Sequence, residues 1–204
     1  MTTAGDTATL DRRAGEDYAE SAPAPAMPAR TVVGVGLRAG VAAGAVMIAW
    51  EMTAAEIARE PTVVAGIGSS TWTPVTGIAS FLLGVDVLSA SFAPGAIVLG
   101  LLVHFAMSAV LGVAGTAALV WVLGYRPGPV GAALCGFAYG LFLEVVVMNI
   151  VVTSIQDPDV VYRAAPEWTW WVAHGAYGIG LGLVGALMLQ RRGEGGFSFQ
   201  STTA

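Results

Sequence analysis

Four ionisable side chains lie inside long apolar stretches of the sequence: two glutamates, Glu51 and Glu144, and two histidines, His104 and His174. An acid beside an imidazole can share a proton with it, and imidazole changes its charge near neutral pH. Ionisable groups within apolar segments are costly and commonly mark proton or ion pathways. We therefore predict that these four side chains, with Asn149, form one polar cluster.

The elements that position this cluster follow from composition. Hydrophobic residues make up 55% of the 204-residue chain, charged residues only 11%, and mean hydropathy is +0.71. A soluble domain carries about 25% charged residues, so this chain lacks the charge to cover a surface that faces water. The composition predicts an integral membrane protein.

A helix that spans a bilayer needs about 20 apolar residues. Four stretches reach that length: residues 39–57 (with an alternative start at 31), 95–123, 129–154 and 168–190. Residues 74–88 are apolar but short and contain Asp86, so we expect an interfacial or re-entrant helix there. Residues 1–30 and 193–204 are polar and predict tails, the first of them disordered. The predicted fold is all-α and polytopic, with four spans within residues 31–192.

The arginines predict the orientation of these spans, because cytoplasmic loops carry an excess of basic residues. If both termini are cytoplasmic, seven of the nine arginines lie inside the cell and two lie outside. At about 1.5 Å per residue, the four ionisable groups then lie roughly 9 to 15 Å from the outer ends of their helices. We expect a plasma (inner) membrane protein with its polar cluster in the outer half of the bilayer.

An internal repeat relates the two halves. His104 and Gly112 match His174 and Gly182 at an offset of 70 residues, and Glu51 matches Glu144 at an offset of 93. This predicts two repeated helical hairpins, as in parallel membrane repeats.

Small residues recur four apart on the same helix faces as the ionisable groups. Such spacing marks close helix contact in membranes, so we expect the polar cluster to point into the bundle. The predicted packing residues are Gly40, Gly44, Gly112, Gly136, Gly140, Gly178 and Gly182.

Three interpretations of the cluster remain open at this stage. The four groups could only hydrogen-bond across helices and fix their register. They could form a proton- or ion-handling site open to the outside. Alternatively, His104 and His174 could be axial ligands of a b-type haem between the second and fourth spans. A dinuclear metal site is disfavoured because the Glu-x-x-His motif is absent, so we expect no bound metal and no cofactor outside the haem alternative.

Other function classes are excluded or disfavoured. The basic residues are all arginine, which removes lysine chemistry, and the single Cys135 cannot form an intrachain disulfide. The net charge is −5 and the chain has no run of basic residues, so it lacks the basic surface that nucleic-acid binding requires. Ser108 lies one turn from His104, but without an oxyanion donor this pair is a poor nucleophile signal. We expect a non-enzymatic protein whose partners are the lipid bilayer and, as alternatives, a second copy or a larger membrane protein.

Several motifs carry a resemblance to a known family: Trp50-Glu51 at the end of the first span, Val103-His104 in the second, and the Pro-Glu-Trp…Ala-His-Gly entry to the fourth, residues 166–175. The chain resembles the small bacterial inner-membrane proteins of the YagU type over about residues 38–189. It departs from them at Glu144. The resemblance implies a bacterial inner-membrane location and a link to acid tolerance. Together with the Glu/His cluster, it predicts a protein that responds to outside pH.

Overall fold

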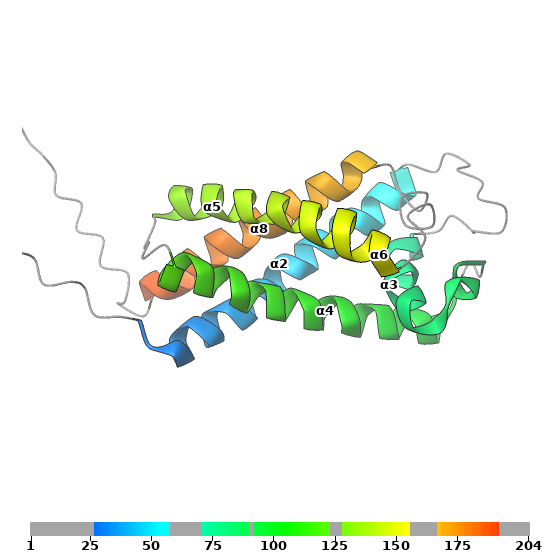
Figure 1. The fold of residues 1–204 in the computed structure, drawn as a ribbon, viewed down its shortest axis with the longest axis horizontal. Coiled ribbons are helices and arrows are strands. Elements are labelled where there is room, and N and C mark those ends of the chain that lie inside the picture. The colour runs from blue at the N-terminus through cyan, green and yellow to red at the C-terminus, as the bar shows by residue number, and fades with distance from the viewer. Residues whose placement is uncertain (1–26, 58–70, 90–91, 123–127, 156–166, 192–204) are drawn as a thin grey trace, which may run out of the picture.

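The computed structural model describes residues 27–57, 71–89, 92–122, 128–155 and 167–191. All regular structure in these ranges is helical. Four of the helices are long and apolar enough to cross a membrane, and they form one elongated bundle (Figure 1). A multi-pass helical membrane protein is therefore the class to which this fold belongs. The disordered tail predicted for residues 1–30 is too long by at least two residues, because Ala29 and Arg30 already belong to the first long helix. Residues 1–26 and the predicted tail 193–204 lie outside the described residues.

The four long helices have clear sequence boundaries. Proline occupies the first turn of two of them, at Pro94 and Pro129, where its missing N–H costs no hydrogen bond. The first helix begins at Ala29, ten residues before the later of its two predicted starts. The bounds are α2 Ala29–Ile57, α4 Pro94–Ala117 with the π-helix η2 Ala118–Val122, α5 Pro129–Leu143 with the π-helix η3 Glu144–Val152 and α6 Thr153–Ile155, and α8 Glu167–Arg191.

The segment predicted as one helix over 74–88 is two elements. Helix α3 spans Thr73–Leu83, and a 3₁₀ helix, η1, spans Val85–Ser89. They are separated by Gly84, whose φ of 84° is one that a side chain disfavours. Val75 of α3 is fully buried, and a side chain at Gly100 of α4 would collide with its carbonyl oxygen. Helix α3 is therefore packed on the bundle, mainly on α4.

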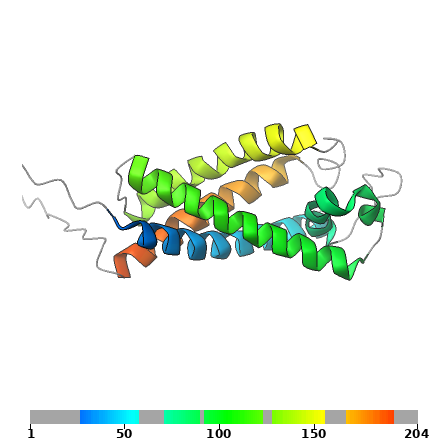
Figure 2. The same ribbon diagram turned by 60° about the horizontal axis from the view of Figure 1, so that its bottom comes forward.

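Helices α2 and α8 form the middle of the bundle. Helix α2 packs on α4 and α8, and α8 packs on α5 (Figures 1 and 2). No comparable interface joins α4 to α5 among the described residues. A bridge between them is the Tyr139 hydroxyl of α5, which donates to the Leu111 carbonyl of α4 at 2.9 Å. Beyond this bridge, towards η3, a cavity separates the two helices.

Glycines make the two tightest interfaces. A Cβ added at Gly112 would strike the Gly36 carbonyl oxygen, and one at Gly182 would strike the Ala132 carbonyl oxygen. The same close approach of a neighbouring helix occurs at the other glycines that the sequence predicts at these interfaces, which are Gly40, Gly44, Gly136, Gly140 and Gly178.

These contacts also give a register between the two hairpins. Gly112 and Gly182 are 70 residues apart, whereas their contact partners Gly36 and Ala132 are 96 apart. The offset of 93 that pairs Glu51 with Glu144 therefore differs from the packing register by three residues. By contact, the two acids are not equivalent, because Glu51 lies nearly one helical turn beyond the position that matches Glu144.

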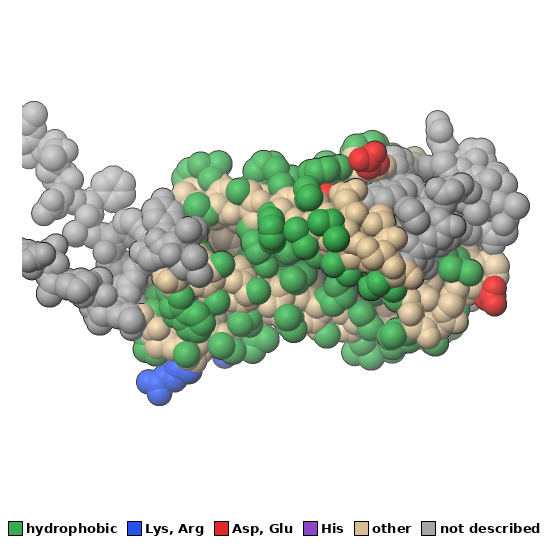
Figure 3. All heavy atoms as spheres, viewed as in Figure 1, with side chains coloured by type: hydrophobic (Ala, Val, Ile, Leu, Met, Phe, Trp, Pro, Cys, Tyr) green, Lys and Arg blue, Asp and Glu red, His purple; other side chains and the backbone are tan. Residues whose placement is uncertain are grey.

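The outer surface of the bundle is apolar in its middle and charged at its ends (Figure 3). Leu102, Val110 and Leu134 are each more than 60% exposed. An arginine is visible at one end of the molecule and acidic side chains near the other. Such an exposed apolar band is what a bilayer covers.

Candidate functional site

Glu144 lies where α5 changes from an α-helix to the π-helix η3. Its side chain is completely buried, at 0% exposure. The preceding turn contains Gly140, where the backbone approaches His174 of α8 so closely that no side chain would fit. π-Helical segments are rare and frequent at functional sites. In this protein the π-helix begins at the buried Glu144.

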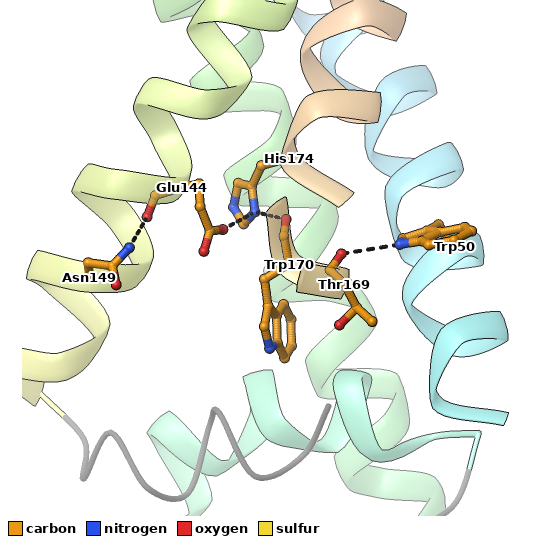
Figure 4. A network of polar contacts seen from close by, with 6 residues as sticks. All are labelled: Trp50, Glu144, Asn149, Thr169, Trp170 and His174. Carbon is orange, nitrogen blue, oxygen red and sulfur yellow. Dashed lines mark hydrogen bonds and ion pairs between the residues drawn. The ribbon is translucent and has the colours of Figure 1, made fainter. Parts of the chain in front are cut away.

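The carboxylate of Glu144 is paired with His174. Glu144 Oε2 lies 2.7 Å from His174 Nδ1 (Figure 4). The same Nδ1 lies 3.0 Å from the Trp170 carbonyl oxygen, one turn earlier on α8. Both neighbours accept hydrogen bonds, so the single N–H at Nδ1 is shared between them. The other carboxylate oxygen, Oε1, has no hydrogen-bond partner within the described residues.

Glu51 of α2 is the second buried acid, at 4% exposure. It is close enough to His174 and Glu144 to interact with both electrostatically. No hydrogen bond to its carboxylate forms within the part of the chain that the structure describes. Helices α2, α8 and η3 thus bring both acids and His174 together.

His104 of α4 has a different partner. Its Nε2 lies 2.9 Å from the Gly44 carbonyl oxygen of α2 and therefore donates to it. Gly44 lacks a side chain, so the imidazole can reach the backbone of α2. His104 is also close enough to His174 for an electrostatic interaction, so the two imidazoles belong to the same region.

Asn149 is not brought into this group. Its side chain is exposed, and its Nδ2 donates to the backbone carbonyl of Glu144 at 3.3 Å (Figure 4). This hydrogen bond supports the main chain of the π-helix. The predicted cluster of five residues is thus found as a group of four, with Asn149 outside it.

A cavity of about 460 Å³ adjoins the cluster, in the space between α4 and η3. Glu51, His104 and His174 line it, while Glu144 lies behind them. Most other lining residues are apolar. They come from all four long helices, from α3 and from η1, and include Met47, Phe81, Leu88, Met107, Leu143, Met148, Val151 and Trp170.

Two lining residues of α8 were not predicted as part of the site. Trp170 is only 8% exposed, and its indole N–H has no acceptor among the described residues. Tyr177 is almost completely buried, and its hydroxyl donates to the Ser108 carbonyl of α4 at 2.7 Å. The sequence signal for Tyr177 was its helical spacing: it lies three residues after His174 and four before Leu181, on the same face of the helix.

The described residues do not fit a haem between His104 and His174. The nitrogen of His104 that would ligate iron, Nε2, donates to Gly44. The glycines of α4 and α8 contact neighbouring backbones, at Gly40 for Gly112 and at Gly136 for Gly178, so these glycines do not provide space for a macrocycle. No group of three His, Cys, Asp or Glu side chains in the described ranges is placed to hold a metal ion.

No family model, no curated protein and no solved structure matches the chain. Its class is therefore given by the fold and the site alone. It is a multi-pass helical membrane protein with a buried acid–imidazole pair beside an apolar cavity.

Proposed function

We propose that this protein is a proton-responsive plasma-membrane protein, without enzymatic activity, whose Glu/His group changes its charge with outside pH. The observation that carries the proposal is the 2.7 Å contact between Glu144 Oε2 and His174 Nδ1, inside a bundle that a bilayer surrounds. A fully buried carboxylate is expensive unless it is paired or protonated. The pair is therefore an arrangement whose stability depends on its protons.

The pair does not titrate alone. Glu51 from α2 and His104 from α4 face the same region, and the hydroxyl of Tyr177 lies on the same face of α8 as His174. The four ionisable groups come from four different long helices. A proton gained or lost by one of them changes the electrostatic energy of the other three, and thereby the packing of the helices that carry them.

The route for protons is proposed to lead from the outside. With both termini in the cytoplasm, the cluster lies in the outer half of the bilayer, at the end of the bundle where α3 packs. The proposal agrees with the acid-tolerance link that the YagU-type resemblance implies. The two hairpins are proposed to be an ancient duplication, since their glycine contacts follow one register.

The experiment is a pH titration of the purified protein in liposomes, followed by tryptophan fluorescence. Trp170 of α8 lines the cavity beside the cluster. Trp50 of α2 donates to the Thr169 carbonyl of α8. Both indoles therefore report on packing near the cluster. We expect a reversible change between about pH 5 and 8. The double variant H104F/H174F should insert into the membrane but lose the change. An unaltered pH response in that variant would overturn the proposal.

A further inference from the structure

The cavity between α4 and η3 has the features of a ligand site. Its volume of about 460 Å³ lies in the range of pockets for small molecules. Several of its lining residues are also exposed on the bundle surface: Leu82 is 65% exposed, Met107 45% and Ile155 67%. On a protein surrounded by lipid, such an opening admits molecules from the bilayer.

The polar groups of the cavity determine what such a molecule must carry. Glu51 lines the cavity, is only 4% exposed, and accepts no hydrogen bond from the described residues. Among the described residues, the lining contains no arginine, and the chain has no lysine. The described arginines, Arg30, Arg38 and Arg191, are exposed and lie on parts of α2 and α8 that do not line the cavity. An anionic ligand would face the Glu51 carboxylate. The basic groups beside it are the imidazoles of His104 and His174, and their contacting nitrogens already donate to Gly44 and towards Trp170 and Glu144.

Trp170 contributes an aromatic ring to the cavity wall, and its N–H would be satisfied by an acceptor atom of a ligand, not by a positive charge. Its buried indole N–H has no acceptor among the described residues, although buried donors are nearly always paired. The ring lines the same cavity as Glu51. A cavity lined by both an aromatic ring and a carboxylate is a favourable environment for an organic cation.

We propose that this cavity binds a lipid-soluble organic cation, with the Glu51 carboxylate as its counter-ion. The apolar walls contact the body of the ligand, and Glu51 balances its charge. When Glu51 is protonated, binding of the cation releases that proton, so the cation and the proton compete for one carboxylate. The inference rests on the proposed function and gives it a ligand class.

The test is calorimetric titration of the full-length protein in detergent with tetraphenylphosphonium. The matched control ion is tetraphenylborate, which has the same shape and the opposite charge. We expect saturable binding of the cation alone, weaker at acidic pH and with proton release in a weakly buffered solution. Equal binding of both ions, or binding of neither, would overturn the inference.

Two variants separate the counter-ion from the cavity. E51Q should weaken cation binding about tenfold or more, because a buried charge partner is lost. E167Q removes an exposed acid at the start of α8 and should leave binding unchanged. G77F should also weaken binding without touching Glu51, because Gly77 lines the cavity and has open space where a side chain would begin. Wild-type affinity in E51Q would contradict the inference, as would wild-type affinity in G77F.

The two proposals fail in different ways. A pH-dependent fluorescence change without cation binding overturns only the ligand. Cation binding that is independent of pH, in a protein whose fluorescence does not respond to pH, overturns the proton-responsive function.

Discussion

Glu144 Oε2 and His174 Nδ1 are 2.7 Å apart, and neither side chain is more than 8% exposed. An acid and an imidazole that hold one proton between them are neutral as a pair when the imidazole is neutral and the acid is protonated, or when both are ionised. A neutral imidazole ring already carries one N–H, so the neutral pair holds one shared proton beyond the bare carboxylate and the neutral ring. The loss of that shared proton leaves a net charge of −1. Inside an apolar bundle, such a charge is costly.

Substituting His174 should lower the free energy of unfolding more than substituting Glu144. H174F leaves a completely buried carboxylate without a partner, so it should lower the free energy of unfolding by about 3 to 5 kcal/mol. E144Q keeps a hydrogen-bond acceptor for Nδ1 and should cost less. The measurement is loss of helical circular dichroism in mixed detergent and SDS.

The double variant E144Q/H174F sharpens this prediction. It removes the unpaired charge that H174F creates, so it should be more stable than H174F alone. If the loss of stability in the double variant equalled the sum of the losses in the two single variants, the interaction free energy between the two residues would be zero. That result would contradict the prediction.

The stability of the bundle should depend on pH in a defined direction. Raising the pH removes the shared proton and leaves a buried negative charge, while strong acid adds a second proton and leaves a positive one. Stability should therefore be greatest between these limits and fall on both sides. The same unfolding assay, repeated over pH, should give a much flatter profile for E144Q/H174F, and equal profiles would contradict the argument.

Glycine contacts should decide whether α5 and α8 can pack. A side chain at Gly178 would collide with the Gly136 carbonyl oxygen, so G178A should destabilise the bundle by about 1 to 3 kcal/mol. A Cβ at Gly34 of α2 would meet no neighbouring atom within 4 Å. G34A should therefore be neutral or slightly stabilising, by up to about 1 kcal/mol, from helix propensity. Equal effects of the two substitutions would be evidence against close packing at Gly178.

The haem alternative leads to a simple spectral prediction. Because His104 Nε2 donates to Gly44 and the space beside the glycines is filled by backbone, the purified protein should be colourless. An absorption spectrum before and after reduction checks this. A Soret band that disappears in H104F and H174F would restore the bis-histidine site.

Much of the fold was predictable because the bilayer imposes a strong length rule. The four spans follow from apolar runs, and the starts of α4 and α5 follow from Pro94 and Pro129. The short helix could be located but not divided correctly, because the apolar pattern continues across Gly84. Its packing on Gly100 depends on tertiary contact that periodicity does not contain.

The site was predictable in its members but only partly in its geometry. The rarity of Glu and His in apolar runs singled out the four residues. It could not tell that Glu144 pairs with His174 while His104 bonds to backbone. Asn149 lies five residues after Glu144, and in the π-helix, whose hydrogen bonds run over five residues, its amide reaches the Glu144 backbone carbonyl. The sequence did not indicate this π-helical segment. The cavity arises from the missing α4–α5 interface, which no local pattern encodes.

The central claim is that the buried carboxylates change protonation as the outside pH changes. Infrared difference spectroscopy of the protein in liposomes measures this directly, in the carboxyl stretching region. The account predicts a protonated-carboxyl band that rises and falls between about pH 5 and 8 and is diminished in E144Q or E51Q. A wild-type spectrum without any carboxyl change over that range would contradict the account. So would spectra of E144Q and E51Q that are identical to the wild-type spectrum.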